Sequence, residues 1–133
     1  MSETTEEFQG PLGPTTASTG GIANIAVTGT SAAVDLTGAN YTTLKAAIDG
    51  GRFLTLCCSA DIWYRWDTAT GTVSETSTAA STPSNQGILL PAGAERTERP
   101  PPGTTFIIVK APAATMLWMW ISSRGLNSDM KSS

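Results

Sequence analysis

The sequence predicts an all-β fold, an antiparallel β-sandwich that is jelly-roll-like and has an extended N-terminal arm. Short β-prone runs separated by turn residues recur between residues 21 and 123, and about seven or eight such runs are typical of sandwich folds. A chain of 133 residues is long enough for one domain with its own core. We therefore expect an arm over residues 1–20, a β-sandwich domain over residues 21–123 and a polar tail over residues 124–133.

Residues 1–20 predict an arm because they combine acidic residues with chain-breaking Gly and Pro and contain no Lys or Arg. Too few of these residues are apolar to offset the entropy cost of ordering them in isolation. Two interpretations stay open, an arm that lies over a neighbouring subunit and a frayed terminus. On the first interpretation, the candidate contact residues are Phe8, Pro11 and Leu12.

The first part of the domain predicts two strands and one short helix. Residues 22–27 and 33–36 are β-prone and flank a turn-like sequence at residues 28–31. Asn40–Asp49 has apolar side chains at helical spacing, and Gly50 follows as a stop signal. These apolar side chains are Leu44, Ala47 and Ile48.

The two central segments carry the strongest strand signal. Arg52–Ala60 is apolar on both faces, and Asp61–Asp67 alternates between an apolar face and a mixed face. The apolar face of the second segment comprises Ile62, Tyr64 and Trp66. We expect these side chains in the core. The opposite face carries Trp63 and Arg65 and is a candidate partner interface.

Beyond these strands the sequence predicts a long loop and two further short strands. Thr68–Gln86 is rich in hydroxyl groups and predicts a surface loop with room for one edge strand. Gly87–Pro91 and Ala94–Arg99 predict strands on either side of a glycine-containing turn. Pro100–Gly103 predicts a stiff turn, because proline cannot donate to a strand ladder.

Arg96 and Arg99 are further interface candidates. On a strand, Arg96 shares a face with Glu98, whereas Arg99 shares the other face with Glu95 and Thr97. Two interpretations stay open for this segment, a solvated edge and a surface that docks onto a partner through ion pairs.

The last two strands are predicted to form a hairpin. Thr105–Lys110 and Thr115–Ser122 flank a turn-like sequence at residues 111–114. The second strand is continuously apolar, which implies burial on both sides. Trp118 and Trp120 share one of its faces. We expect one face of this strand in the core and the other in a subunit contact.

The sequence predicts neither catalysis nor a cofactor or metal. It contains no histidine, which removes the commonest general base and zinc ligand. Cys57 and Cys58 would point to opposite faces of a strand, so we expect free thiols that behave as small core residues. The acidic residues are scattered over predicted turns and strand ends, which does not favour a catalytic pair.

The charge and hydropathy of the chain also exclude several partners. The net charge is −3, which gives no field that favours nucleic acid or an anionic membrane. No apolar stretch approaches the ~20 residues of a membrane span, and the first residues lack the features of a secretory signal. We expect a soluble protein made in the cytosol.

Three segments follow one another in a characteristic order from about Gly51 to Ser122. They are Ser59–Trp66 (SADIWYRW), Leu90–Gly93 (LPAG) and Phe106–Ile121, with a stretch rich in Ser, Thr and Ala after the first. This order resembles that of small virion proteins of tailed phages, known as cement, decoration or capsid-stabilising proteins. The prolines of Glu98–Gly103 depart from the pattern.

The resemblance implies a β-sandwich knob that self-associates as a homotrimer or homodimer. It also implies binding to the major capsid protein at subunit junctions on the virion surface, after assembly in the host cytoplasm. The role would be mechanical, because many weak contacts across subunit borders stabilise a shell.

Two other classes stay open. The first is a phage tail or head-fibre-associated module that binds a receptor or glycan through Trp63 and the Thr68–Gln86 loop. The second is a bacterial carbohydrate-binding or adhesin domain, which would usually bring a signal peptide or a larger parent chain. Binding of the isolated protein to a host glycan at Trp63 would favour the first.

Overall fold

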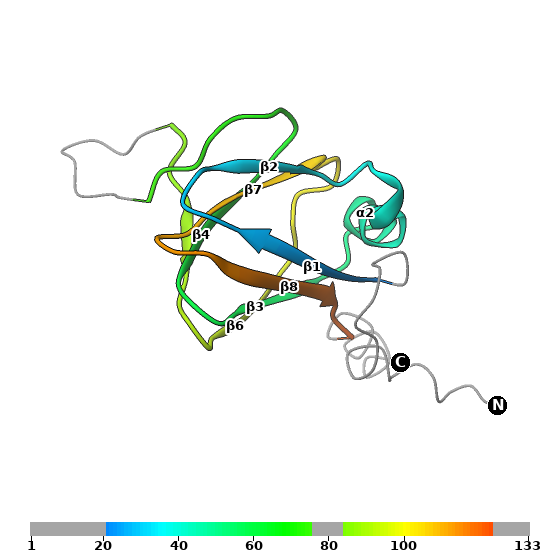
Figure 1. Cartoon of the computed structure of the whole chain (residues 1–133). Helices are drawn as coiled ribbons and strands as arrows, with labels where there is room; N and C mark the ends of the chain where they lie inside the picture. Colours follow the sequence, from blue (N-terminus) through cyan, green and yellow to red (C-terminus); the bar gives the residue numbers. More distant parts are fainter. Residues whose placement is uncertain (1–20, 76–83, 124–133) are drawn as a thin grey trace.

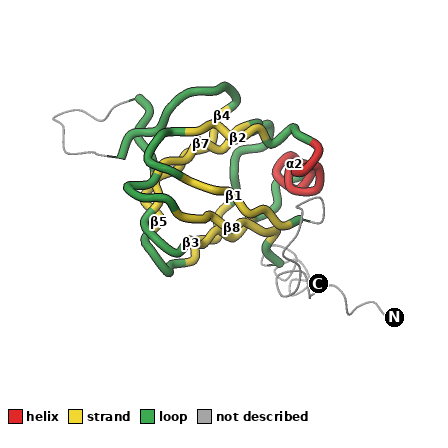
Figure 2. The backbone as a smooth tube through the Cα atoms, in the orientation of Figure 1, coloured by secondary structure: helices red, strands yellow, loops and turns green. Residues whose placement is uncertain are grey.

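The structure is a computed structural model that describes residues 21–75 and 84–123, and these fold into a two-layer β-sandwich with one short α-helix (Figures 1 and 2). The described residues contain eight strands in two antiparallel sheets, so the predicted all-β sandwich is confirmed. The expected arm over residues 1–20, with its candidate contacts Phe8, Pro11 and Leu12, lies outside the described residues, as does the expected tail over residues 124–133.

Each layer has four strands. The first sheet has the order β1 (Ile22–Val27), β8 (Thr115–Ile121), β3 (Leu54–Cys58) and β6 (Glu95–Glu98). The second sheet has the order β2 (Ala32–Asp35), β7 (Phe106–Lys110), β4 (Ile62–Asp67) and β5 (Ile88–Leu90).

The strand pairs are nested along the chain. β1 pairs with β8, β2 with β7, β3 with β6 and β4 with β5, and the sheets are completed by the pairs β3 with β8 and β4 with β7. Every pair therefore joins one strand from β1–β4 with one strand from β5–β8. Neighbours in the sheets are distant in the sequence, apart from β4 and β5.

The predicted hairpin of the last two strands is wrong. β7 lies in the second sheet between β2 and β4, whereas β8 lies in the first sheet between β1 and β3. The turn at residues 111–114 carries the chain from one layer to the other, and Ala111 N donates to the Thr28 carbonyl oxygen at 2.9 Å. The physical reason is that an apolar strand can be buried in either sheet, so its composition does not choose its pairing partner.

The core lies between the two layers and is filled by alternate residues of the strands. The largest of its fully buried strand side chains are Leu54, Leu56, Leu117 and Met119 from the first sheet and Ile62, Tyr64, Leu90 and Ile107 from the second. Trp66 is partly buried against this core. The expected inward face of the Asp61–Asp67 segment is thus confirmed.

The short helix is also confirmed. α2 (Thr42–Asp49) follows a 3₁₀ turn, η2 (Ala39–Tyr41), and lies at one end of the two layers (Figure 1). Its buried residues are Leu44, Ala47 and Ile48, as the helical spacing predicted. The helix ends at Gly50, whose N–H donates to the Ala46 carbonyl oxygen at 3.0 Å.

Candidate functional site

The outer face of the first sheet is the most distinctive surface of the described residues. Side chains on this face alternate with the core residues of the same strands. We call it the tryptophan face. It comprises Ile22, Asn24 and Ala26 on β1, Met116, Trp118 and Trp120 on β8, Thr55, Cys57 and the preceding Phe53 on β3, and Glu95, Thr97 and the following Arg99 on β6.

The two tryptophans occupy the middle of this face. Trp118 lies opposite Asn24 on one neighbouring strand and Cys57 on the other, and Trp120 lies opposite Ile22 and Thr55. Both tryptophan side chains are half-buried. β8 is therefore apolar along its whole length for two reasons. One of its faces lies in the core, and its other face carries the two tryptophans and points away from the core.

Charge on the tryptophan face is confined to the β6 edge. Glu95 and Arg99 are exposed at opposite ends of this edge, with Thr97 between them. The Arg99 guanidinium lies 5.9 Å from the centre of the Phe53 ring, within cation–π distance. Burial, and then the charge of Glu95, raises the pKa of the Cys57 thiol. Cys57 is therefore a poor thiolate nucleophile.

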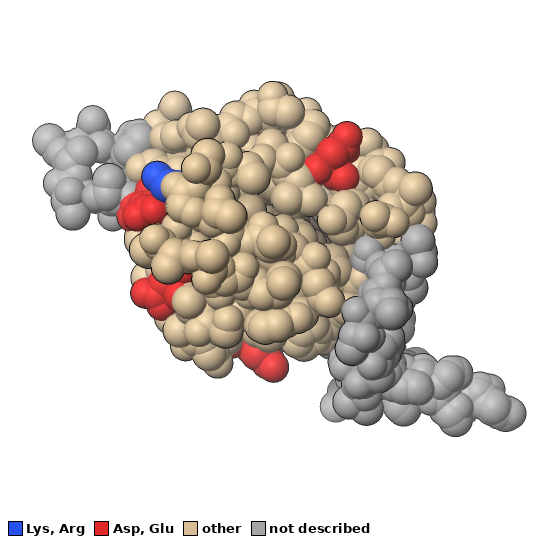
Figure 3. All heavy atoms as spheres, in the orientation of Figure 1, with Lys and Arg blue, Asp and Glu red and all other residues tan. Residues whose placement is uncertain are grey.

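The residue types on this face are those that protein interfaces prefer. Trp, Phe, Met and Arg are enriched in interface cores, where charged residues other than Arg are depleted. The part of the surface in view in Figure 3 likewise carries few charged side chains among the described residues.

Arg96 and Glu98 point the opposite way, between the two layers. Arg96 Nη2 donates to the Leu89 carbonyl oxygen at 2.7 Å, and Trp66 Nε1 donates to Glu98 Oε2 at 2.6 Å. These bonds join β6 of the first sheet to β5 and β4 of the second. The solvated-edge interpretation is therefore wrong for Arg96, because its guanidinium is used within the fold. Inward-pointing charges on an edge strand also oppose edge-to-edge pairing with other chains.

Tyr64 is the buried neighbour of these charges. Burial, and then the negative charge of Glu98, raises the pKa of its phenol, so the hydroxyl stays protonated throughout the physiological range. The Tyr64 hydroxyl makes no hydrogen bond of normal geometry within the described residues. It is packed in the core and is not among the residues that line the groove described below.

The outer face of the second sheet is covered by part of the chain itself. Ile108 and Val73 are both almost fully buried, although Ile108 points away from the main core. Arg65 Nε donates to the Thr72 carbonyl oxygen at 2.9 Å, and the same guanidinium pairs with Asp67 and lowers the pKa of that carboxyl. We call residues 71–75 the covering segment.

The covering segment also reaches Trp63. A Cβ atom placed on Gly87 would lie 3.3 Å from Trp63 Cβ and would overlap the Val73 side chain, so these three residues pack closely together. The structure thus places Trp63 and Arg65 on the less buried face of β4, as expected, but both are half-buried beside this segment.

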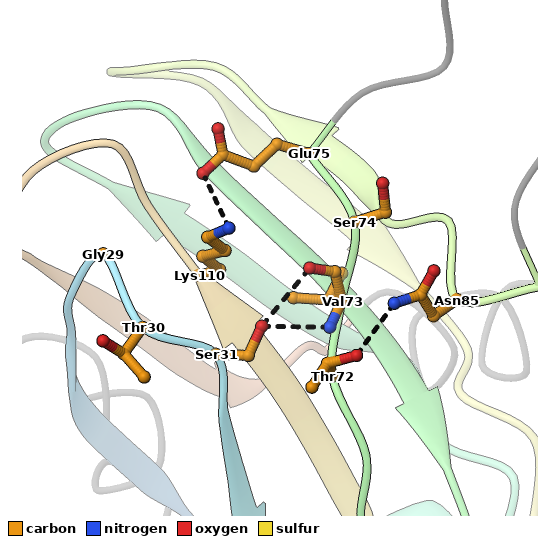
Figure 4. Close-up of a pocket in the computed structure, with 9 residues that line it drawn as sticks. All are labelled: Gly29, Thr30, Ser31, Thr72, Val73, Ser74, Glu75, Asn85 and Lys110. Atoms are coloured by element: carbon orange, nitrogen blue, oxygen red, sulfur yellow. Dashed lines mark hydrogen bonds and ion pairs between the residues drawn. The ribbon is translucent and has the colours of Figure 1, made fainter. Parts of the chain in front are cut away.

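An open groove of about 710 Å³ lies beside the covering segment (Figure 4). Its lining comprises Gly29, Thr30, Ser31, Thr72, Val73, Ser74, Glu75, Asn85 and Lys110. Lys110 pairs with Glu75 at 3.6 Å, and Asn85 Nδ2 donates to Thr72 Oγ1 at 2.8 Å. The polar groups are thus largely bonded to one another, and these lining residues include no aromatic ring on which a sugar could stack.

Residues 21–75 and 84–123 contain neither a cluster of metal-ligating side chains nor a helix that could span a membrane. In these ranges no group of three or more His, Cys, Asp or Glu side chains could hold a metal ion. Within the same ranges no helix is long and apolar enough to cross a membrane. Cys57 and Cys58 are both free, with Cys58 buried and Cys57 half-buried on the tryptophan face.

The structure brings together only some of the predicted site residues. Trp118, Trp120 and Arg99 share the tryptophan face, whereas Arg96 points inward and Trp63 and Arg65 lie in the other layer. Phe53, Met116 and Glu95 also belong to this face but were not among the predicted site residues, although Glu95 was expected to share a strand face with Arg99. Alternation with the core residues Leu117 and Leu54 was the signal for Met116 and Phe53, but the choice of core face was not fixed by the sequence.

No protein-family model, curated protein or solved structure matches this chain. The function is therefore argued from the geometry of these surfaces.

Proposed function

We propose that this protein is a structural virion protein that binds the outside of a phage capsid and stabilises contacts between major capsid protein subunits. The observation that carries the proposal is the tryptophan face, on which half-buried aromatic side chains point away from the core and charge is confined to one edge. Such a face is suited to contact with another protein surface.

The nested strand pairs support the same proposal. We infer that they form a jelly roll, because pairing β1 with β8, β2 with β7, β3 with β6 and β4 with β5 corresponds to one long hairpin rolled into two layers. Jelly rolls recur in viral capsid and lectin domains. A fold shared with viral capsid domains supports the proposal by analogy only. The tryptophan face remains its main support.

The proposed role also accounts for the composition of the chain. Charged residues make up 14% of the sequence, so a large part of the surface can be desolvated against protein at low cost. On a shell, several modest contacts act together, and an N-terminal arm over residues 1–20 would add one more for each copy. The proposal thus includes contacts by Phe8, Pro11 and Leu12.

Binding to undecorated shells of the same phage tests the proposal. Purified full-length protein is mixed with shells and sedimented, and the bound fraction is measured against total concentration. We expect saturation at a fixed number of copies per shell, weaker binding of Trp118→Ser and of a variant lacking residues 1–20, and wild-type binding by the control Lys45→Ala on α2. A protein that stays in the supernatant at every concentration would overturn the proposal.

A glycan-binding module is the second candidate function, because the open groove beside the covering segment is lined with polar groups, although these are largely bonded to one another and include no aromatic ring on which a sugar could stack. Thr30, Asn85 and Lys110 place hydroxyl, amide and ammonium groups on its walls. Titration with host-cell glycans, followed by NMR shifts, distinguishes the two candidates. Shifts at these three residues together with no shell binding would favour the glycan module.

A further inference from the structure

We propose that the tryptophan face is a self-association surface, on which a second copy of this chain packs about a two-fold axis that sets Glu95 of each copy against Arg99 of the other. The inference rests on the proposed role of this face in protein contact and names its occupant. The second copy then occupies the tryptophan face, so each copy of a dimer contacts the shell through its remaining surface. The weaker shell binding expected for Trp118→Ser then follows from loss of the dimer and of its avidity.

The charges on the face are arranged so that it complements itself. Glu95 and Arg99 are both exposed, and both belong to the β6 edge, with Thr97 midway between them. Consider a two-fold axis that lies in the plane of the interface, passes over Thr97 and runs perpendicular to the strands. Rotation about this axis places β6 of the second copy over β6 of the first, in the antiparallel direction. Glu95 then faces Arg99 twice, as a closed two-fold interface requires.

The uncharged part of the face fits the same operation. Trp120, Thr55 and Thr97 lie in one row across the sheet, because Thr55 pairs with both of the others. This row lies on the axis, so Trp120 packs against Trp120 of the second copy. Phe53 and Cys57 lie at equal distances on either side of Thr55, and each faces the other across the interface. The result is an aromatic centre with paired charges at one edge.

A two-fold axis parallel to the strands lacks this complementarity. Such an axis places β6 over β1 of the second copy. Residues that share a row across the sheet then face one another across the interface. Glu95 then faces Asn24, since both lie in the row of Trp118 and Cys57. No opposite charge meets Glu95 in that arrangement, so the charge pattern selects the first axis.

The size of the face predicts a weak and reversible dimer. Four strands at the usual spacing, each about six residues long, give a footprint of roughly 400 Å² per copy. The total of about 800 Å² is below the roughly 1,200 Å² of stable specific interfaces and is typical of weak, transient contacts. We therefore expect a concentration-dependent equilibrium between monomer and dimer rather than an obligate dimer.

Sedimentation equilibrium of the full-length chain, from about 1 µM to about 1 mM protein, tests the proposal without any shell. We expect a reversible dimer whose dissociation constant rises at least about tenfold with Trp120→Ser. Glu95→Arg and Arg99→Glu are each expected to raise it by about three- to tenfold, because each sets like charges against one another. The double variant should return to within about twofold of wild type, since it restores both pairs with reversed polarity.

Lys45→Ala, which removes a charge on α2 that is not part of the face, is the control and should leave the dimer unchanged. Circular dichroism of every variant confirms that the fold is retained. A protein that is monomeric at every concentration overturns the proposal. So does a dimer that is insensitive to Trp120→Ser, or one that the double charge reversal fails to restore. Shell binding by a monomer would leave the proposed function intact while overturning this inference.

Discussion

Glu98 shows how a single side chain can join the two layers. It belongs to β6 of the first sheet, and its carboxylate accepts a hydrogen bond from Trp66 Nε1 of β4 at 2.6 Å. Arg96, two residues earlier, binds the Leu89 carbonyl oxygen from the same face of the strand. The charges of Arg96 and Glu98, which the sequence alone allows to be solvated, thus hold β6 of the first sheet against β4 and β5 of the second.

Replacing Glu98 should therefore destabilise the fold. In Glu98→Ala the partly buried Trp66 N–H loses its acceptor, and we expect the free energy of unfolding to fall by about 1–3 kcal/mol. Urea denaturation followed by circular dichroism measures the change. The matched control is Glu95→Ala on the same strand, whose exposed side chain faces outward and whose loss should change stability by less than about 0.5 kcal/mol. Equal effects of the two variants would contradict this account.

At the scale of elements, the covering segment decides the environment of Trp63 and Arg65. The backbone of this segment binds Ser31, since Val73 N donates to Ser31 Oγ at 3.1 Å and Ser31 Oγ donates to the Val73 carbonyl oxygen at 3.3 Å. Arg65 binds Thr72 from the opposite side. Val73 and Ile108 are both buried outside the main core.

Gly87 is the position at which this packing is tightest. We expect Gly87→Ala to lower the free energy of unfolding by about 1–3 kcal/mol, because the added methyl group overlaps Val73 and closely approaches Trp63. Thermal unfolding followed by circular dichroism measures the effect. Gly29→Ala is the control, because its methyl group would make only an ordinary contact 3.7 Å from the Ala111 carbonyl oxygen. A Gly87→Ala protein as stable as Gly29→Ala would show that the covering segment is not packed as described.

For the whole molecule, the nested pairing makes the two halves of the chain depend on each other. All six strand pairs of the described residues join β1–β4 to β5–β8. β8 separates β1 from β3, and β7 separates β2 from β4. Neither half can therefore form any of these pairs by itself.

This arrangement predicts that the chain can be divided between its halves. Fragments 1–79 and 80–133 should each lack native β structure alone and should form a stable one-to-one complex when mixed, because the complex restores every strand pair. Circular dichroism and size-exclusion chromatography test the outcome. As a comparison, fragment 1–112 retains four of the six pairs and should keep partial structure alone. A native-like spectrum from either half alone would contradict the prediction.

The sequence by itself determined the elements and most of the core. Alternation in Asp61–Asp67 identified Tyr64 as an inward residue, and helical spacing in Asn40–Asp49 identified Leu44 as another. These features are local, because the period of the apolar residues follows directly from backbone geometry. The absence of histidine likewise limited the chemistry that any site could perform.

Only the tertiary structure decided which strands meet and which side chains face outward. The last two strands enter different sheets, Trp118 and Trp120 point away from the core, and Arg96 points between the layers. Each outcome depends on partners far away in the sequence. Both layers offer an apolar inner face of similar composition, so the choice between them rests on the packing of the whole sandwich rather than on any one segment.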